Sequence, residues 1–285
     1  MKTTLRLVAP LAGAILALGT GAALAQDIAV SADVAESGVL PIANTLDYAP
    51  FEYLDADGNP TGIVIELATA AAAAMGVDLD IQRTPFPSMI PGLAAGRFNV
   101  AWETFSATPE RLEQVDFVMW LKAGVVASTL PDMVGEFEGD TPLCGKSVGV
   151  SAGSVADFLV EKLTEECAAA GLDPVEGSVF NNSTDIVNAV LSGRIDARLD
   201  DATASSFFET ESGGRLVVLP TLYEVAPLGM AIAKDDPETA EMMRTALAAL
   251  FADGTYEAVL DKYGMGLYAI QEPYFVGSMD DLRED

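Results

Sequence analysis

The strongest constraint on the fold is the alternation of short strand-like segments with longer segments that resemble helices. An Ala-rich stretch from Ile65 to Met75 predicts a helix that ends at Gly76, and Val77 to Ile81 alternates like a strand. The same order returns in the second half, where a strand over 147–150 precedes a helix over 155–169. Strands that alternate with helices favour an α/β fold with a largely parallel sheet.

The other segments continue this alternation. Further helices are expected over 87–95, 185–191, 202–209, 236–252 and 254–263, and further strands over 98–102, 197–199, 216–219 and 230–233. Residues 39–57 are expected to form a strand, a loop and a second short strand, followed by a turn over 58–62. The segment 55–59 resembles the start of a calcium loop, but Pro60 stands where that loop needs glycine, which favours a hairpin turn.

The first 25 residues have the features of a cleaved export signal. Lys2 and Arg6 form a short basic start, an apolar run follows over 7–24, and Ala23-Leu24-Ala25 provides a small-residue cleavage pattern. We therefore expect residues 1–25 to be a signal peptide and the mature chain to begin at Gln26; a membrane anchor is the alternative. No later segment reaches the roughly 20 apolar residues that a membrane-spanning helix needs.

Composition excludes several classes of function. The chain contains 43 acidic and 15 basic residues, a formal net charge of −28, so it would be repelled by nucleic acid and by anionic lipid. It contains no histidine, which removes the commonest general base and the commonest metal ligand. We expect no metal, no cofactor and no nucleic-acid partner.

The two cysteines, Cys144 and Cys167, are expected to form a disulfide after export to an oxidising compartment. Such a bridge would contribute roughly 3–4 kcal/mol on the chain-entropy view. Two separate buried thiols are the alternative.

Several motifs occur in a fixed order over nearly the whole chain that follows the signal. They are Asp47-Tyr48-Ala49-Pro50-Phe51-Glu52 with Gly62-Ile63-Val64-Ile65-Glu66-Leu67; Phe86-Pro87-Ser88-Met89 continuing to Gly96; Thr108-Pro109-Glu110-Arg111 continuing to Val115-Asp116-Phe117; Gly193-Arg194-Ile195-Asp196-Ala197 with Asp201; Cys144-Gly145-Lys146-Ser147 with Gly153-Ser154; and Gly254-Thr255-Tyr256 with Lys262-Tyr263-Gly264. Together they resemble the polar amino-acid-binding branch of the bacterial ABC-transporter solute-binding proteins, family 3.

The resemblance implies a two-lobe periplasmic binding protein fold of type II, with two strands crossing the hinge. Lobe one would comprise 26–122 and 227–285, and lobe two would comprise 125–222. The hinges would lie near 122–125 and 222–227. Hinge closure around a ligand is a known motion of such proteins.

The resemblance also implies a set of ligand-binding residues. Arg111 presents a fork of donors that matches a carboxylate, and it resembles the carboxylate-binding arginine of the family. The backbone N–H groups of Ser106, Ser154 and Val155 would complete the carboxylate site, the last two at a helix N-terminus. A surface ion pair with Glu110 or Glu113 is the alternative for Arg111.

Asp201 resembles the ammonium-binding aspartate of the family, and its alternative role is to cap the helix that begins near Ala202. Thr104 would supply a carbonyl to the same ammonium. Tyr48 and Phe86 resemble the aromatic residues that enclose the ligand side chain, although an aromatic residue is more often part of a core.

Glu103 departs from the family pattern, in which a small polar residue is common at this position. Its carboxylate would face a cationic group of the ligand, pair with Arg111, or point into solvent.

We therefore expect a periplasmic, monomeric component of an ABC import system that captures an amino acid or a derivative and delivers it to permease subunits in the inner membrane. The alternatives are a cyclohexadienyl-dehydratase-like enzyme on the same scaffold, with Glu103 as its proton donor, and a ligand-sensing domain.

Overall fold

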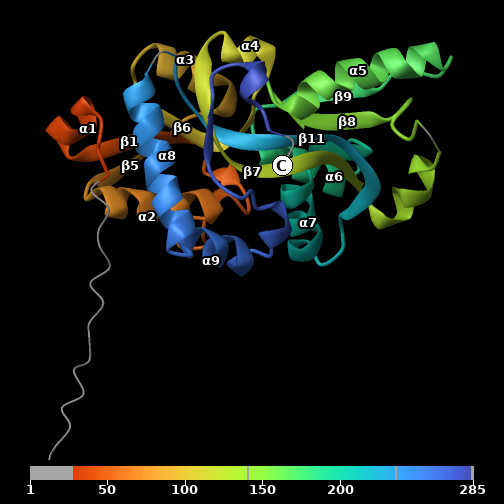
Figure 1. Ribbon diagram of the computed structural model, residues 1–285. Coiled ribbons are helices and arrows are strands. Elements are labelled where there is room, and N and C mark those ends of the chain that lie inside the picture. The colour runs from red at the N-terminus through yellow and green to blue at the C-terminus, as the bar shows by residue number, and fades with distance from the viewer. Residues whose placement is uncertain (1–27, 140, 235, 284–285) are drawn as a thin grey trace, which may run out of the picture.

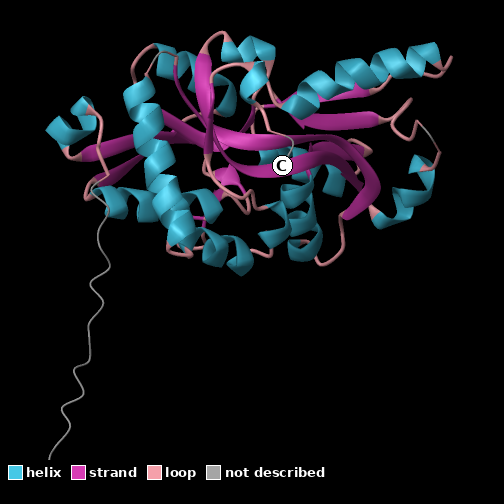
Figure 2. Cartoon of the chain, viewed as in Figure 1, coloured by secondary structure: helices cyan, strands magenta, loops and turns pink. Residues whose placement is uncertain are grey.

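The computed structural model describes residues 28–139, 141–234 and 236–283, and Figures 1 and 2 show the chain in one orientation. The predicted signal peptide, residues 1–25, and the predicted mature start at Gln26 lie outside the described residues. None of the helices in the described part combines the length and the apolar character that a bilayer-spanning helix requires.

One mixed sheet of nine strands forms the centre of the described chain, in the order β5-β1-β6-β11-β7-β10-β8-β9, with β12 paired to β7. Its strands are β1 (Val39–Asn44), β5 (Asp78–Arg83), β6 (Val100–Ser106), β7 (Val115–Thr129), β8 (Ser147–Ser151), β9 (Glu176–Phe180), β10 (Ala197–Asp201), β11 (Val217–Ala233) and β12 (Tyr274–Val276). The pairs β1–β5, β1–β6, β8–β9 and β8–β10 are parallel. The long strands β7 and β11 pair antiparallel with each other and with their other neighbours. The expectation of a largely parallel sheet therefore holds for the outer strands only.

The helices lie on both faces of this sheet (Figure 2). They are α1 (Ala32–Ser37), α2 (Ile63–Met75), α3 (Met89–Ala94), α4 (Pro109–Leu112), α5 (Val155–Ala169), α6 (Ser183–Leu191), α7 (Ala202–Glu211), α8 (Pro237–Ala252) and α9 (Thr255–Lys262), with short 3₁₀ segments at Phe86–Ser88, Pro131–Phe137, Gly266–Tyr268 and Met279–Asp281. Helix α2 ends at Gly76, which adopts φ of 71°, a left-handed conformation that glycine adopts without steric cost.

The hydrophobic core is divided between two halves of the molecule. In one half, α2 and α8 cover one face of β1, β6 and β7, while Met89, Leu93 and Phe98 form a cluster on the other face. In the other half, α5 packs on β8 and β10, and α6 contributes a smaller cluster around Ile186 and Leu216. In Figure 1, β7 and β11 run across the middle of the molecule between these halves. This is the expected two-lobe organisation with two crossing strands; the exact boundaries at 122–125 and 222–227 stay a prediction.

A small second sheet of β2 (Asp47–Tyr48), β3 (Glu52–Leu54) and β4 (Pro60–Thr61) lies beside the main one. Strands β3 and β4 are antiparallel, and the N–H of Asp55 donates to the carbonyl of Asn59 at 2.9 Å. The segment that resembles a calcium loop is therefore the hairpin turn that Pro60 favours.

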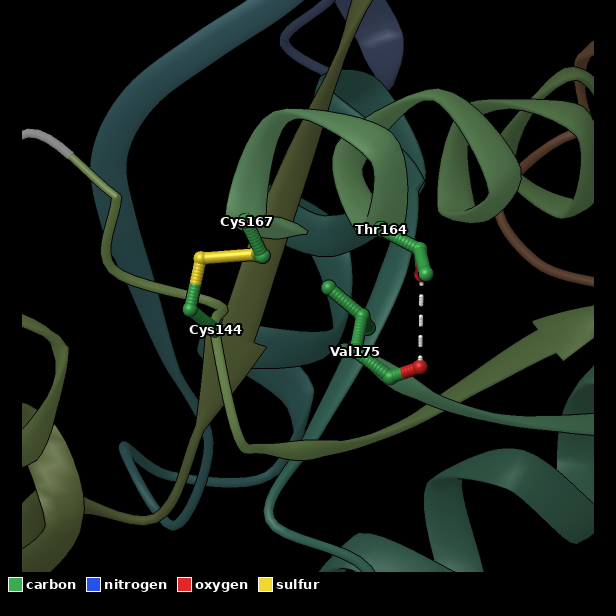
Figure 3. The surroundings of a disulfide bond; sticks show 4 residues. All are labelled: Cys144, Thr164, Cys167 and Val175. Carbon is green, nitrogen blue, oxygen red and sulfur yellow. Dashed lines mark hydrogen bonds between the residues drawn. A yellow bond between two sulfur atoms is a disulfide. The ribbon is translucent and has the colours of Figure 1, made fainter. Parts of the chain in front are cut away.

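The expected disulfide between Cys144 and Cys167 is present, with a Cα–Cα distance of 5.6 Å. Figure 3 shows that it joins the loop before β8 to the last turn of α5. In the same helix, the Thr164 hydroxyl donates to the carbonyl of Val175 at 3.4 Å. The end of α5 is thus fixed to the chain on both sides of it.

Strand β11 differs most from expectation. The sequence predicts two short strands at 216–219 and 230–233, whereas β11 runs unbroken from Val217 to Ala233. Its register against β7 shifts at three places, and several side chains in its middle are exposed. Bulges of this kind interrupt the side-chain alternation by which a strand is recognised.

Candidate ligand-binding site

A pocket of about 670 Å³, part of it open to solvent, lies between the two lobes. All nine residues that the sequence predicts for the ligand site line it, namely Tyr48, Phe86, Glu103, Thr104, Ser106, Arg111, Ser154, Val155 and Asp201. The wall also contains residues that were not predicted, namely Thr45, Asp47, Val125, Ser151, Ala152, Ala156, Asn181, Asn182, Ser183 and Asp200. A largely preformed cleft with converging polar groups is the usual form of a small-molecule site.

Arg111 is held in a fixed direction by α4. Thr108 precedes this helix, Pro109 occupies its first turn, and the Thr108 hydroxyl accepts from the N–H of Arg111 at 3.3 Å. The guanidinium donates to the carbonyl of Ser106 at 2.7 Å and, across the cleft, to the carbonyl of Gly153 at 2.6 Å. Only 6 % of Arg111 is exposed, so the alternative of a surface ion pair with Glu110 or Glu113 is wrong. Burial lowers the pKa of Arg111 to about 10, and the guanidinium stays charged at neutral pH.

The aromatic side chains of the pocket are supported from behind. Phe86 stacks on Phe105 with ring centroids 4.6 Å apart, and the Arg111 guanidinium carbon lies 5.7 Å from the centre of the Phe86 ring. Tyr48 stacks on the buried Phe51 at 5.5 Å. Each of these two rings therefore packs against a second aromatic ring, which favours one orientation of its plane.

Asp201 faces the pocket from the end of β10. Its Oδ2 accepts from the hydroxyl of Tyr48 at 3.0 Å and from that of Thr104 at 3.4 Å, and both donors belong to lobe one. Asp201 is the N-cap residue of α7, but its side chain makes no capping hydrogen bond, so the capping alternative is wrong. Burial raises the pKa of Asp201 to about 6, although the two hydroxyls and the arginines 198 and 111 act in the opposite direction.

Asp200 is a pocket residue that the sequence analysis missed. Its Oδ1 accepts from the Tyr48 hydroxyl at 2.7 Å and from the N–H of Asp201 at 2.8 Å, and its carboxylate forms an ion pair with the buried Arg198. The hydrogen bond to the next N–H turns this side chain toward the pocket at the strand end. The sequence analysis predicted Asp201 from the family resemblance alone, and that resemblance carried no signal for its neighbour Asp200.

The N-terminus of α5 lies at the pocket, as the sequence predicts for Ser154 and Val155. Ser154 caps the helix by accepting from the N–H of Asp157 at 3.2 Å, and Asp157 accepts in return from the N–H of Gly153 at 2.9 Å. The N–H of Ser154 donates to the carbonyl of Ser151 at 3.1 Å and is therefore used inside this turn. A ligand carboxylate would instead meet the positive end of the helix at Val155.

Glu103 lies in the pocket wall, and only 2 % of it is exposed, which excludes the solvent-facing alternative. Its Oε1 accepts from the N–H of Thr45 at 2.7 Å. Pairing with Arg111 is also wrong, because the guanidinium donates to backbone carbonyls and forms no ion pair with Glu103 among the described residues. Burial raises the pKa of Glu103 to about 7, with Asp47 acting in the same direction.

The pocket is strongly acidic. Asp47, Glu103, Asp200 and Asp201 line it, whereas Arg111 is the one basic residue in the described wall. The described residues hold no cluster of three or more groups suited to bind a metal ion. Such a wall suits an organic ligand with one carboxylate and an excess of positive charge.

The sequence is similar to a known protein family and to characterised members of it. Residues 40–266 match the bacterial extracellular solute-binding proteins, family 3. The arginine-binding protein ArgT of Corynebacterium glutamicum is 28 % identical over 236 residues, covering 81 % of this chain and 76 % of that protein. The histidine-binding periplasmic protein of Salmonella typhimurium is 29 % identical over 262 residues, which cover 87 % of this chain and 96 % of that protein.

A solved structure shares the architecture. The ancestral amino acid-binding protein AncCDT-1, described as a precursor of cyclohexadienyl dehydratase, superposes with a TM-score of 0.73 at 27 % identity and covers 81 % of this chain and 97 % of its own. These relatives are binding proteins, so the dehydratase alternative has no support from them. The chain belongs to the bacterial extracellular solute-binding proteins of family 3 and has their two-lobe, type II fold.

Proposed function

We propose that this protein captures a basic amino acid, with L-arginine as the first candidate, between its two lobes and delivers it to an ABC permease. The observation that carries the proposal is the charge of the pocket, whose wall contains four carboxyl groups, one of them paired with the buried Arg198, and one guanidinium. An amino acid with an anionic side chain would meet like charge in this wall, whereas a cationic side chain would find partners. The arginine-binding and histidine-binding relatives support the same choice.

In the proposed complex, the α-carboxylate of the ligand binds Arg111. Two guanidinium donors are used by the carbonyls of Ser106 and Gly153, and the fork has further N–H groups for a carboxylate. The positive end of α5 at Val155 lies beside it.

The α-ammonium of the ligand binds Asp201, replacing the weak hydrogen bond from Thr104. An ammonium this close favours the ionised carboxylate and offsets the burial that raises the pKa of Asp201. The side chain then passes between Tyr48 and Phe86 toward Glu103 and Asp47, where a guanidinium finds an acidic wall.

The proposed biological setting is the periplasm. Export through residues 1–25 would bring a monomeric binding protein to the permease subunits in the inner membrane, and the acidic composition gives no surface for nucleic acid. The disulfide suits an oxidising compartment.

A thermal-shift screen of the purified mature protein tests the ligand class. We expect arginine, lysine and ornithine to raise the melting temperature in proportion to their affinity, because a ligand that binds only the native state stabilises it by mass action. Glutamate and aspartate are expected to leave it unchanged. A larger shift with glutamate or aspartate than with any basic amino acid would contradict the proposal.

Uptake separates transport from sensing. Cells that lack this chain are expected to take up labelled arginine more slowly, and the wild-type chain restores the rate. Unchanged uptake together with tight arginine binding in vitro would favour the sensing alternative.

A further inference from the structure

A second buried carboxyl group lies behind the pocket wall, beside Glu103. Glu52 begins β3 and is 0 % exposed, and Glu103 on β6 is 2 % exposed. The chain reaches Glu52 directly after the pocket residue Tyr48 and the short turn that follows it. Glu103 faces the ligand site, whereas Glu52 does not line it.

The two carboxyl groups have no basic partner. Neither oxygen of Glu52 has a hydrogen-bond partner of good geometry in the described chain, although the carboxyl of Glu103 and the amide of Asn44 lie close enough to act on it. No lysine or arginine of the described residues forms an ion pair with either glutamate. Two adjacent buried carboxyl groups without a cation cannot both be ionised, because neither charge is compensated.

Further charged and titratable groups lie around the two glutamates, and they include both acidic and basic side chains. The negative charge of Asp47 on β2 raises the pKa of both glutamates. Glu52 in turn raises the pKa of Tyr48, which lies on the same strand as Asp47. Arg83 at the end of β5 acts on Asp47 and donates through Nε to the carbonyl of Thr45. Thr45 in turn holds Glu103 through its N–H.

We propose that Glu52 keeps its proton and shares it with Glu103, so that the pair presents one negative charge to the pocket, and that this charge binds the distal cationic group of the ligand. Glu103 then contacts the ligand, and Glu52 is a positioning residue that acts through Glu103. This inference rests on the proposed function, because it assigns the part of the site that selects a basic side chain.

The pair makes selectivity depend on pH. Burial raises the pKa of Glu52 well above its usual range and that of Glu103 to about 7, so Glu52 stays protonated at neutral pH while Glu103 is partly ionised. A ligand cation favours the ionised form of Glu103 and therefore expels a proton on binding. Affinity for a cationic side chain should rise with pH until Glu103 is fully ionised.

The probes are L-arginine and L-citrulline, which have nearly the same shape but differ in the charge of the distal group. Both carry the same α-carboxylate and α-ammonium, so the titration of Asp201, whose pKa lies near 6, cancels in the ratio of their affinities. Calorimetric titration of the wild type from pH 6 to pH 8 is expected to show this ratio rising about tenfold. The reason is that the ligand cation binds the ionised form of a single group, Glu103, whose pKa is about 7. At pH 7, binding of arginine should release about half a proton more than binding of citrulline. This number is obtained from the binding heats measured in buffers of different ionisation enthalpy.

Two variants separate the roles. Glu103→Gln removes the charge and should lower the ratio by about tenfold or more and make it independent of pH. Glu52→Gln supplies permanent N–H donors in place of the proton that Glu52 keeps, so Glu103 should still titrate and the ratio should rise with pH as in the wild type. Glu66→Gln, at a partly exposed ion pair with Lys262 outside the pocket, is the control and should behave as wild type.

The outcomes distinguish the inference from the proposed function. If the wild type binds neither probe, the proposed function fails. If it binds arginine with a ratio that is independent of pH and with no extra proton release, the shared proton is wrong whether or not the variants fold. If Asp47→Asn, rather than Glu103→Gln, removes the pH dependence, the titrating partner of the ligand is Asp47 and the inference is wrong.

Discussion

The guanidinium of Arg111 is the anchor of the site, because it is buried and donates to carbonyls of both lobes. Arg111→Ala would leave the carboxylate of a bound amino acid without its partner in a closed cleft. We expect arginine affinity to fall by about 2–5 kcal/mol, which is several tens-fold to thousands-fold, in a calorimetric titration.

Arg215→Ala is the matched control, since this exposed arginine lies outside the pocket and donates to the carbonyl of Ser212. It should bind arginine like the wild type. An unchanged affinity in Arg111→Ala would remove this residue from the ligand site.

Glu103 also gives a prediction for the stability of the ligand-free protein. Burial raises its pKa from 4.5 to about 7, so the folded state holds this proton more tightly than the unfolded chain does. Its contribution to stability is full below pH 4.5 and is lost as the pH rises to 7. Between pH 5 and pH 8 the free energy of unfolding should therefore fall by on the order of 2–3 kcal/mol more in the wild type than in Glu103→Gln. Urea unfolding at both pH values measures this difference, and parallel profiles would show that Glu103 does not titrate as proposed.

The structure places together in one pocket the residues for which chemistry and family pattern agreed, while their role in ligand binding stays a prediction. Arg111, Asp201, Tyr48 and Phe86 all line the pocket. Glu52 belongs to the same motif as Tyr48, but nothing in a three-residue strand reveals that a carboxyl group is fully buried. Burial of a charged group is decided by tertiary packing, so it became visible only in the structure.

At the scale of elements, the disulfide fixes the C-terminal end of α5 to the loop before β8. Replacing Cys144 and Cys167 with serine should lower the free energy of unfolding by about 2–4 kcal/mol, because the unfolded chain regains the freedom of the closed loop. Arginine affinity should stay within about twofold, since neither cysteine lines the pocket.

Denaturant unfolding followed by calorimetry on the same sample checks both parts. A double variant that loses affinity and stability together would contradict the separation of this loop from the site. Two alkylatable thiols in the exported wild-type protein would contradict the disulfide itself.

The helices were more predictable than the long strands. Helix α2 carries a repeated apolar face and ends at Gly76 as predicted, although it begins at Ile63, two residues before the predicted start at Ile65. Strand β11 instead contains Pro220 and Pro227, a positive φ at Glu224 and an exposed middle, and its continuity depends on pairing with β7. Pairing partners that are distant in sequence cannot be read from one segment, and this is why β11 was predicted as two pieces.

At the scale of the whole molecule, the order of the motifs along the chain determined the two-lobe prediction better than any single element did. The two long strands cross between the lobes, and each lobe has a hydrophobic cluster of its own, although Ala204 of α7 packs with the lobe-one cluster. The hydrogen bonds of Tyr48 with Asp200 and Asp201, and of Arg111 with Gly153, join the lobes across the pocket.

This arrangement predicts closure on ligand binding. Arginine bridges donors and acceptors of both lobes, so the ligand-bound protein should be held in the closed arrangement and the free protein should open. Solution X-ray scattering is expected to show a smaller radius of gyration with saturating arginine than without it. Tight binding with an unchanged radius would contradict a clamp between two moving lobes.

The most direct test of the central claim is a calorimetric titration of the purified wild-type protein at pH 7.5 with L-arginine and, separately, with L-glutamate. The acidic pocket predicts one bound arginine per chain and no measurable heat of binding with glutamate, because Glu103 and Asp47 repel a second carboxylate while Arg111 is used by the first. Glutamate binding as tight as that of arginine, or tighter, would show that the pocket does not select a cationic amino acid.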